Sequence, residues 1–273
     1  MLKSVKIILF LIFPGLIFAQ SNPEEIYDRA SEEFGKANYT ESYKLYDEYI
    51  KLSPDSSKGY VGKANILLLT NMPDDALKIY NEVLDKNPNS APALSGRGVV
   101  YTMKGDYAYA IEDFKKSLLY DSTNTSTLNS LAATYLKVGY IDDAIKIFDR
   151  SLLSDPDNPE TYRNISVVHF NLGDTIKAFD ALNKALEINP GNVNVLNTRG
   201  ALYKECKKHE LAIKDYDKVL ELDPQNAEAF CRRGIAYLML GNKKKAVEDM
   251  EYGIKLNPGF KPQVEAYLIE AKN

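Results

Sequence analysis

Hydrophobic positions recur along this chain with the spacing of a helix, and this spacing is interrupted at regular intervals. Leu94, Gly98 and Tyr101 lie at i, i+4 and i+7, which predicts one face of a helix. Gly105-Asp106 then predicts the end of that helix and the start of another, with Gly as C-cap and Asp as N-cap. The same spacing resumes afterwards through Ala110, Phe114 and Ser117. The stretch is therefore predicted to form a helix-turn-helix hairpin.

This hairpin pattern recurs every 34 residues. One slot in the second helix is small in every copy: Ser42, Ala76, Ala110, Ala144, Ala178, Ala212 and Ala246. A slot in the first helix is also small: Ala30, Ala64, Gly98, Ala132, Ser166, Gly200 and Gly234. Four residues after the small slot of the second helix comes a large slot, with Tyr46, Tyr80, Phe114, Phe148, Leu182, Tyr216 and Met250. One such hairpin buries too little apolar surface to be stable alone, so neighbouring hairpins are expected to stack.

The 34-residue period, the small and aromatic slots, and a Pro after most second helices resemble the tetratricopeptide repeat family. The resemblance covers seven units without insertion: 23–56, 57–90, 91–124, 125–158, 159–192, 193–226 and 227–260. It implies an all-α fold, a right-handed α-solenoid superhelix of seven hairpins, with residues 261–273 as a C-terminal capping helix. Two departures are the lack of Trp and the bulky Tyr49 in a slot that is smaller in later units.

The first 19 residues have the pattern of a secretory signal peptide. Lys3 and Lys6 precede an apolar run from Ile7 to Phe18, and Ala19 offers a small residue for cleavage. The run is short for a membrane span, although an uncleaved anchor is the alternative interpretation. We expect cleavage after Ala19, an extracytoplasmic location (periplasmic or secreted), and no membrane span in the mature chain.

The charge balance argues against a nucleic-acid partner. Without Lys3 and Lys6 the chain carries 32 basic and 38 acidic residues, whereas nucleic-acid binding calls for a basic stripe. The two cysteines, Cys206 and Cys231, lie at opposite ends of adjacent first helices, about 13 Å apart along the helix axis. That separation exceeds the reach of a disulfide, so both are interpreted as packing residues.

Charged residues at two slots predict ion pairs across three of the hairpins. The third, sixth and seventh units have both Arg before the small slot of the first helix and Asp before the large slot of the second, whereas the fourth and fifth units have apolar residues at both places. The predicted structural pairs are Arg97–Asp113, Arg199–Asp215 and Arg233–Asp249.

No enzyme active site is predicted. The chain has two histidines, His169 and His209, and its sequence contains no HExxH, CxxC or GxSxG motif and no phosphate-binding glycine loop. No cofactor and no metal are therefore expected.

The family resemblance places particular positions of each first helix on the concave face of the solenoid. In this sequence they supply the candidate residues for binding a protein or peptide partner: Asn65, Asn129, Arg163, Asn164, Phe170, Asn197 and Lys204. We expect a non-catalytic scaffold whose groove binds a peptide or protein segment. The alternative is a subunit of an envelope assembly or secretion complex that docks through its convex or end surfaces. The sequence leaves the oligomeric state open.

Overall fold

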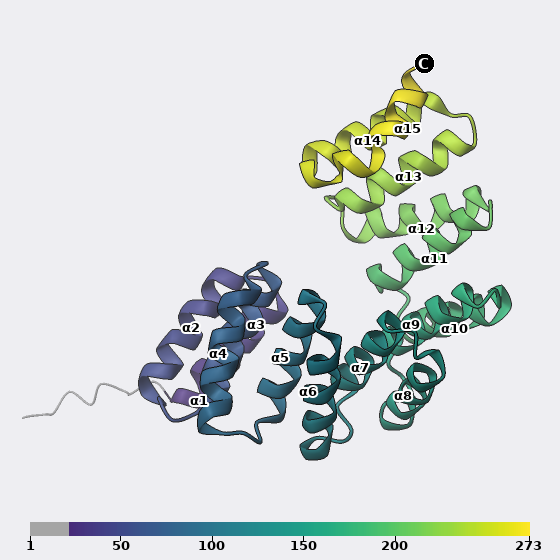
Figure 1. Cartoon of the computed structure of the whole chain (residues 1–273). Helices are drawn as coiled ribbons and strands as arrows, with labels where there is room; N and C mark the ends of the chain where they lie inside the picture. The colour runs from purple at the N-terminus through teal and green to yellow at the C-terminus, as the bar shows by residue number, and fades with distance from the viewer. Residues whose placement is uncertain (1–21) are drawn as a thin grey trace, which may run out of the picture. The chain divides into compact units, whose positions relative to one another are not determined.

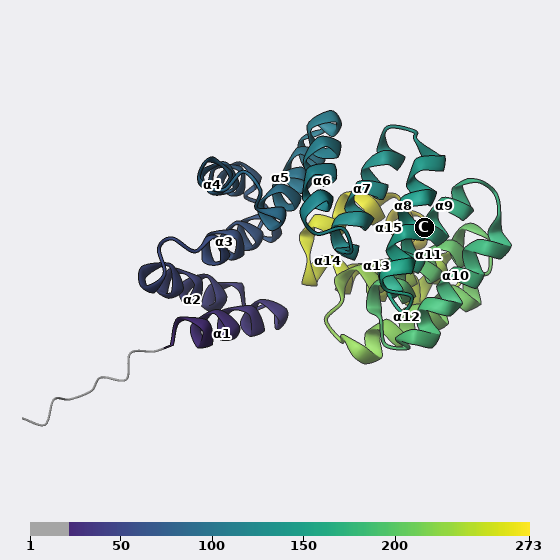
Figure 2. The ribbon, with the colours of Figure 1, turned by 90° about the horizontal axis from the view of Figure 1, so that it is seen from below.

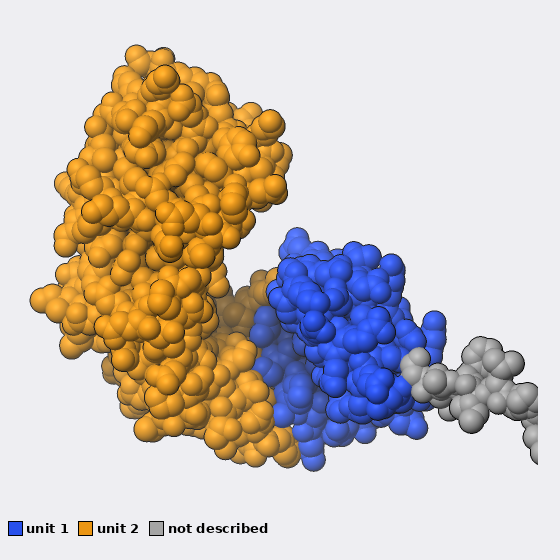
Figure 3. Space-filling model, turned by 180° about the vertical axis from the view of Figure 1, so that it is seen from behind, with its two compact units in different colours: residues 1–100 blue, residues 101–273 orange. Residues whose placement is uncertain are grey.

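The computed structural model of the protein describes residues 22–273, and the predicted signal segment lies outside these residues. Within them the chain forms fifteen α-helices, one short 3-10 helix and no strand, so the predicted all-helical hairpin fold is confirmed. Two compact units are distinguished, residues 1–100 and residues 101–273, and Figure 3 colours them separately.

The helices follow one another in the predicted order. The first five are α1 Pro23–Gly35, α2 Tyr39–Leu52, α3 Ser57–Leu69, α4 Pro73–Lys86 and α5 Ala91–Lys104, which continues past the boundary between the units. The next five are α6 Tyr107–Tyr120, α7 Thr125–Lys137, α8 Ile141–Ser154, α9 Pro159–Asn171 and α10 Thr175–Ile188. The last are α11 Val193–Glu205, α12 His209–Leu222, α13 Ala227–Met239, α14 Lys243–Leu256, η1 Pro258–Phe260 and α15 Lys261–Lys272. Within the unit of residues 101–273, successive hairpins lie side by side in chain order (Figures 1 and 2).

The small slots lie where the helices pack most tightly. Alanine is fully buried in the second-helix slot from Ala76 to Ala246, and Ser42, which replaces it in the first unit, donates a hydrogen bond to the Ala30 carbonyl at 2.8 Å. The large slot is equally buried, with Tyr80, Phe114 and Met250 all fully enclosed. Small and large residues therefore interlock, as the dense packing of protein interiors requires.

The bulky Tyr49 is accommodated by a glycine in the next repeat. Its side chain is 1% exposed, and a Cβ added at Gly59 would come within 2.8 Å of the Tyr49 ring. The Tyr49 hydroxyl also lies 2.9 Å from Ser56 Oγ. The first unit thus keeps its larger residue because the facing position has no side chain.

Each hairpin turn contains one residue in the left-handed backbone region. Glycine occupies this position in four turns, with φ near +80°, but Ala37, Asn71 and Lys207 occupy it in the others, with φ of 59°, 60° and 58°. The predicted glycine C-cap is therefore correct for the turn at Gly105. Asp106, however, makes no capping hydrogen bond through its side chain, whereas Asp174, which starts α10, accepts one from Lys177 N–H.

The predicted capping helix is present as α15, and it packs on the last hairpin. Val264 is 1% exposed within a hydrophobic cluster that includes Met250 and Leu238, and Tyr267 packs against the same cluster. Among the described helices, none combines the length and the apolar character that crossing a membrane would require.

Candidate functional site: the first-helix groove

Three hollows follow one another along the first helices of the unit of residues 101–273. The first, of about 390 Å³, lies between α7 and α9, and the second, of about 490 Å³, lies between α9, α11 and α13. The third, of about 200 Å³, lies between α13 and the capping helix α15. Arg163 borders the first and second hollows, while Glu228 and Arg232 border the second and third. Because they share these residues, the hollows form one continuous surface, which we call the first-helix groove.

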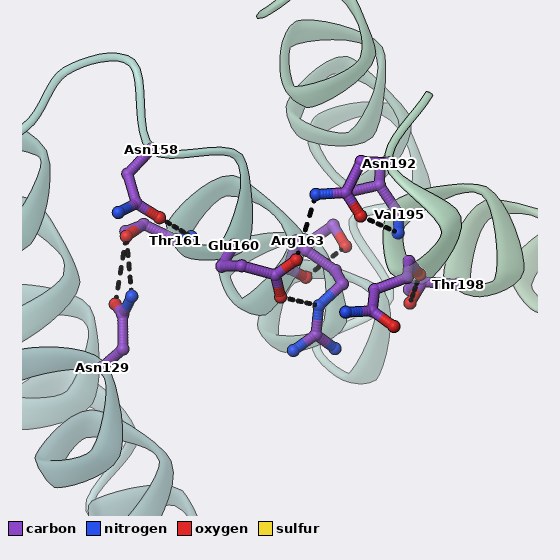
Figure 4. A network of polar contacts seen from close by, with 10 residues as sticks. Asn129, Asn158, Glu160, Thr161, Arg163, Asn192, Val195 and Thr198 are labelled. Atoms are coloured by element: carbon purple, nitrogen blue, oxygen red, sulfur yellow. Dashed lines mark hydrogen bonds and ion pairs between the residues drawn. The ribbon is translucent and has the colours of Figure 1, made fainter. Parts of the chain in front are cut away.

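Asparagines at the starts of the first helices connect neighbouring repeats along this groove. Asn158 Oδ1 accepts the backbone N–H of Thr161 at 3.1 Å, and Asn192 Oδ1 accepts that of Val195 at 3.0 Å. Asn192 Nδ2 also donates to Glu160 Oε1 at 3.1 Å, so the cap of α11 holds a residue of α9 (Figure 4). Capping a helix with Asn satisfies one of its free backbone donors, and here the remaining amide group joins two repeats.

Thr161 provides a second connection, between α7, α8 and α9. Its fully buried hydroxyl lies 2.9 and 3.1 Å from the two amide atoms of Asn129 (Figure 4). The same hydroxyl lies 3.0 Å from Ser151 Oγ of α8. Asn129 therefore lines the groove, but its amide is already engaged between repeats.

The charged groups of the groove are paired with one another. Arg163 Nε donates to Glu160 Oε2 at 2.8 Å, Arg232 Nη2 lies 2.7 Å from Glu228 Oε1, and Lys204 Nζ lies 2.9 Å from Glu205 Oε1. Burial raises the pKa of Glu160, but hydrogen bonds from Arg163 and Asn192 outweigh it and hold the pKa below its ordinary value. The carboxylate is thus ionised at neutral pH and neutralises its arginine.

Asn197, which lines the second hollow, has a buried Oδ1 without a hydrogen-bond partner, and the buried Tyr216 hydroxyl has Arg232 as its polar neighbour. Burial raises the pKa of Tyr216 to about 12, and Arg232 opposes the rise, so the hydroxyl keeps its proton. An unsatisfied buried polar group costs roughly 1–3 kcal/mol, so native proteins contain few of them.

Five of the seven predicted binding residues line the first-helix groove, and two, Asn65 and Phe170, do not. Asn129, Arg163, Asn164, Asn197 and Lys204 line the first-helix groove. Asn65 belongs to the other unit, where its Oδ1 accepts the Tyr80 hydroxyl at 2.5 Å. Phe170 is partly buried and packs against the hydrophobic cluster that contains Leu182 and Leu202.

Sequence reasoning missed several residues of this groove. Asn194 and Thr198 line the second hollow, and both occupy slots that the family pattern assigned to the concave face or its edge. Gln263 and Tyr267 of the capping helix line the third hollow. The sequence pattern predicted only that this helix caps the end of the repeats. Its packing against α13 shows that it also borders the groove.

Two of the predicted ion pairs have bidentate geometry. The Arg199 guanidinium donates to both oxygens of Asp215, at 2.9 and 2.6 Å, and that of Arg233 to both oxygens of Asp249, at 2.7 and 2.9 Å. Each Arg also reaches the preceding hairpin, Arg199 at Asn183 and Arg233 at Asp217. The third pair, Arg97–Asp113, joins residues of different units and stays a prediction. Arg97 Nη1 donates to Asn81 Oδ1 at 2.9 Å.

The described residues contain no group of three or more His, Cys, Asp or Glu side chains that is arranged to hold a metal ion. Cys206 and Cys231 are free thiols, and burial raises the pKa of Cys231 to about 11.

Comparison with known proteins gives a family and a fold. Models described as "Tetratricopeptide repeat" match residues 27–91, 70–125, 101–165, 159–192, 181–214 and 227–260, and one described as "TPR repeat" matches 200–241. No curated protein matches the chain.

Solved structures of other repeat proteins have a similar fold. A tetratricopeptide repeat protein from Parabacteroides merdae is 17% identical, with a TM-score of 0.66 over 92% of this chain and 99% of that one. Yeast Tom70 is 19% identical, with a TM-score of 0.71 over 92% of this chain and 53% of that one. One chain of the APC/C hetero-tetramer Cut9–Hcn1 is 17% identical, with a TM-score of 0.74 over 93% of this chain and 51% of that one. The chain thus spans about half the length of the last two. With repeat models matching from residue 27 to residue 260, the chain belongs to the tetratricopeptide repeat family.

Proposed function

We propose that the protein is a non-catalytic scaffold that binds an extended peptide or protein segment in the first-helix groove, the concave face of its repeats. The observation that carries this proposal is the continuity of the three hollows through Arg163, Glu228 and Arg232. A continuous surface along four successive first helices matches an extended chain better than a compact small molecule.

The side chains that line the first-helix groove suit a peptide backbone. Hydroxyl and amide side chains line the first two hollows, and they can both donate and accept hydrogen bonds: Thr125, Ser126, Ser130, Asn164, Asn194 and Thr198. Because the arginines of the groove are paired with glutamates, the groove does not select strongly for an acidic partner. We therefore expect salt to weaken binding only slightly.

The predicted signal peptide supports an extracytoplasmic setting for this activity, in the cell envelope or outside the cell. The proposed partner is accordingly a protein or peptide of that compartment, and nucleic acid is not expected.

A display experiment tests the function. Random dodecapeptides on phage are selected against the purified chain, and the selected peptides are then measured in solution by fluorescence polarisation. We expect the double variant Arg163→Ala, Asn197→Ala to bind about tenfold more weakly or worse, since several hydrogen bonds are lost. Lys146→Ala, on the exposed surface of α8, is the matched control and should bind as the parent does. Failure to select peptides, or equal binding by both variants, would exclude this groove.

One feature favours docking through the outer helices as a second candidate. Leu119 on α6 and Leu153 on α8 occupy the same slot and are 79% and 83% exposed. The other units have charged residues there: Lys51, Asp85, Glu187, Glu221 and Lys255. Replacing both leucines with glutamate would abolish such docking while leaving the groove unchanged.

A further inference from the structure

Five exposed lysines gather on two neighbouring hairpin turns near the end of the array. Lys207 and Lys208 lie in the α11–α12 turn, and Lys243, Lys244 and Lys245 form the first turn of α14, directly after the α13–α14 turn. The two helices of each hairpin are antiparallel, and the two hairpins pack on each other through α12 and α13, so both turns lie at the same edge of the unit. We call these five residues the lysine edge.

The lysines of the outer helices differ from these five in being paired. Lys146, Lys184 and Lys218 each lie within 3.6 Å of an Asp or Glu three residues away. Among the described residues, no carboxylate forms an ion pair with the lysine edge, and two of its ammonium groups lie over aromatic rings instead. The positive charge of this edge is therefore left for an outside partner.

Few acidic side chains accompany the lysine edge. Its two turns and the helix residues beside them contain Glu205 and Glu210, and Lys204 already neutralises Glu205 at 2.9 Å. The turns between successive repeats lie at the opposite edge of the unit, and their charged residues are all acidic: Asp121, Asp155, Asp157 and Asp223. The two edges of the unit thus have opposite charge.

This asymmetry determines how the protein meets a charged surface. The chain as a whole has a formal net charge of −4, so an anionic surface attracts it only through a local positive cluster. At physiological salt, charges more than about 8 Å away are largely screened, so the lysine edge dominates once it is in contact. An anionic surface therefore binds the protein in one orientation.

Exposed apolar side chains lie beside the lysines. Met239 and Leu240 come at the end of α13 and in the turn after it, and each is 42% exposed, while Leu211 in the first turn of α12 is 38% exposed. Scattered apolar residues on a surface are ordinary. Apolar residues among unpaired cations, however, supply the two contributions that hold a peripheral protein on a lipid surface, insertion and electrostatic attraction.

The choice of lysine favours a lipid surface over a protein partner. Lysine is a point charge on a flexible stem, which fits lipid phosphates in any arrangement, whereas the planar guanidinium of arginine suits a fixed carboxylate. The neighbouring Arg199 and Arg233 are used in that second way, within the hairpins. None of the five lysines lines the three hollows of the first-helix groove, where a peptide would lie.

We propose that the lysine edge docks the protein on a membrane surface rich in anionic phospholipid headgroups. The five ammonium groups lie against the lipid phosphates, and Leu211 and Leu240 enter the layer between the headgroups and the acyl chains. Clusters of four to eight basic residues bind anionic membranes in this way. The protein lies on the membrane without crossing it. The docking surface shares no residue with the lining of the groove, so this inference does not depend on the proposed function.

Co-sedimentation with lipid vesicles tests this inference. The purified chain without the predicted signal segment, whose apolar run could itself bind lipid, is mixed with vesicles of phosphatidylcholine alone or with one third phosphatidylglycerol. We expect binding to the phosphatidylglycerol vesicles only, and release when the salt concentration is raised to about 0.5 M. Equal binding to both kinds of vesicle would overturn the proposal.

Two triple variants with the same net charge separate the lysine edge from general electrostatic attraction. The first changes three residues of the edge: Lys243→Gln, Lys244→Gln and Lys245→Gln. Each lysine near an anionic membrane contributes about fivefold in affinity, so this variant should bind about a hundredfold more weakly. The control changes three exposed lysines of the outer helices and should bind as the parent does: Lys146→Gln, Lys184→Gln and Lys218→Gln. An equal loss in both variants would overturn the proposal.

Two further measurements complete the test. Leu240→Ser should weaken vesicle binding several-fold at every salt concentration, because the contribution of this side chain is apolar. The same preparations are also measured against a DNA duplex. If the lysine edge binds the duplex and leaves the phosphatidylglycerol vesicles unbound, its partner is a nucleic acid and the membrane proposal is wrong.

Discussion

One backbone position in each hairpin turn favours glycine over residues that carry a side chain. All seven turns place a residue at positive φ, and four of them use glycine. Lys207 adopts φ of 58° with a side chain that is exposed to solvent. An L-residue is strained in this region because its Cβ lies too close to the following carbonyl oxygen, whereas glycine has no Cβ and is not strained.

Lys207→Gly is therefore predicted to stabilise the protein. We expect the free energy of unfolding to rise by about 0.5–1 kcal/mol, the relief of left-handed strain less the entropy that glycine loses. Urea denaturation followed by circular dichroism measures this change. Gly139→Ala, at the same position of another turn with φ of 83°, serves as the opposite control and should lower stability by about 1 kcal/mol. A loss of stability in Lys207→Gly would refute the strain argument.

At the scale of helix pairs, the hairpins use two kinds of contact between their first and second helices. The sixth and seventh repeats have bidentate arginine–aspartate pairs, and Asp215 and Asp249 are only 5% and 8% exposed. The fourth and fifth repeats have apolar residues at both positions, Leu131 with Ile147 and Ile165 with Ala181. Since both kinds occur in one array, an apolar pair can take the place of the ion pair at this contact between the two helices of a hairpin.

This equivalence predicts a non-additive pair of substitutions. Arg199→Leu alone leaves the buried Asp215 carboxylate without its main partner, and Asp215→Ile alone does the same to the guanidinium. Each single variant should lose about 2–4 kcal/mol, reduced from the fully buried case because Arg199 is partly exposed. The double variant, which copies the fourth repeat, should recover to within about 1 kcal/mol of the parent chain. A double-mutant cycle in urea checks this, and simple addition of the two losses would contradict it.

The capping helix α15 is the element whose role extends beyond the seven repeats. It covers the apolar face of the last hairpin with Val264, and it also supplies Gln263 and Tyr267 to the third hollow. Stability in repeat arrays depends mainly on nearest neighbours, so damage to this helix should remain local.

Val264→Ala tests that locality. Removing two methyl groups from a fully buried side chain should cost about 2 kcal/mol, with the loss concentrated in α13, α14 and α15. Hydrogen exchange read by mass spectrometry should show faster exchange there and unchanged exchange in α7 and α8. Uniformly faster hydrogen exchange over residues 101–273 would mean that this unit unfolds as one cooperative body instead.

For the whole molecule, the 34-residue period was enough to predict the hairpins and the capping helix, because small and large slots recur in register. It also predicted most of the groove, since residues such as Arg163 and Asn197 occupy fixed slots of each first helix. The engagement of Asn129 by Thr161 escaped prediction because it depends on which side chains meet between repeats.

The central claim, that partners lie in the first-helix groove, is tested most directly by site-specific photo-cross-linking in the producing cell. A benzophenone amino acid is placed either at Ala133, which is exposed in the first hollow, or at Leu153, which is exposed on the outer side of α8. Groove binding predicts a discrete adduct from position 133 that Asn197→Ala and Arg163→Ala together abolish, and no such adduct from position 153. An adduct from position 153 alone would contradict the account and favour docking through the outer helices.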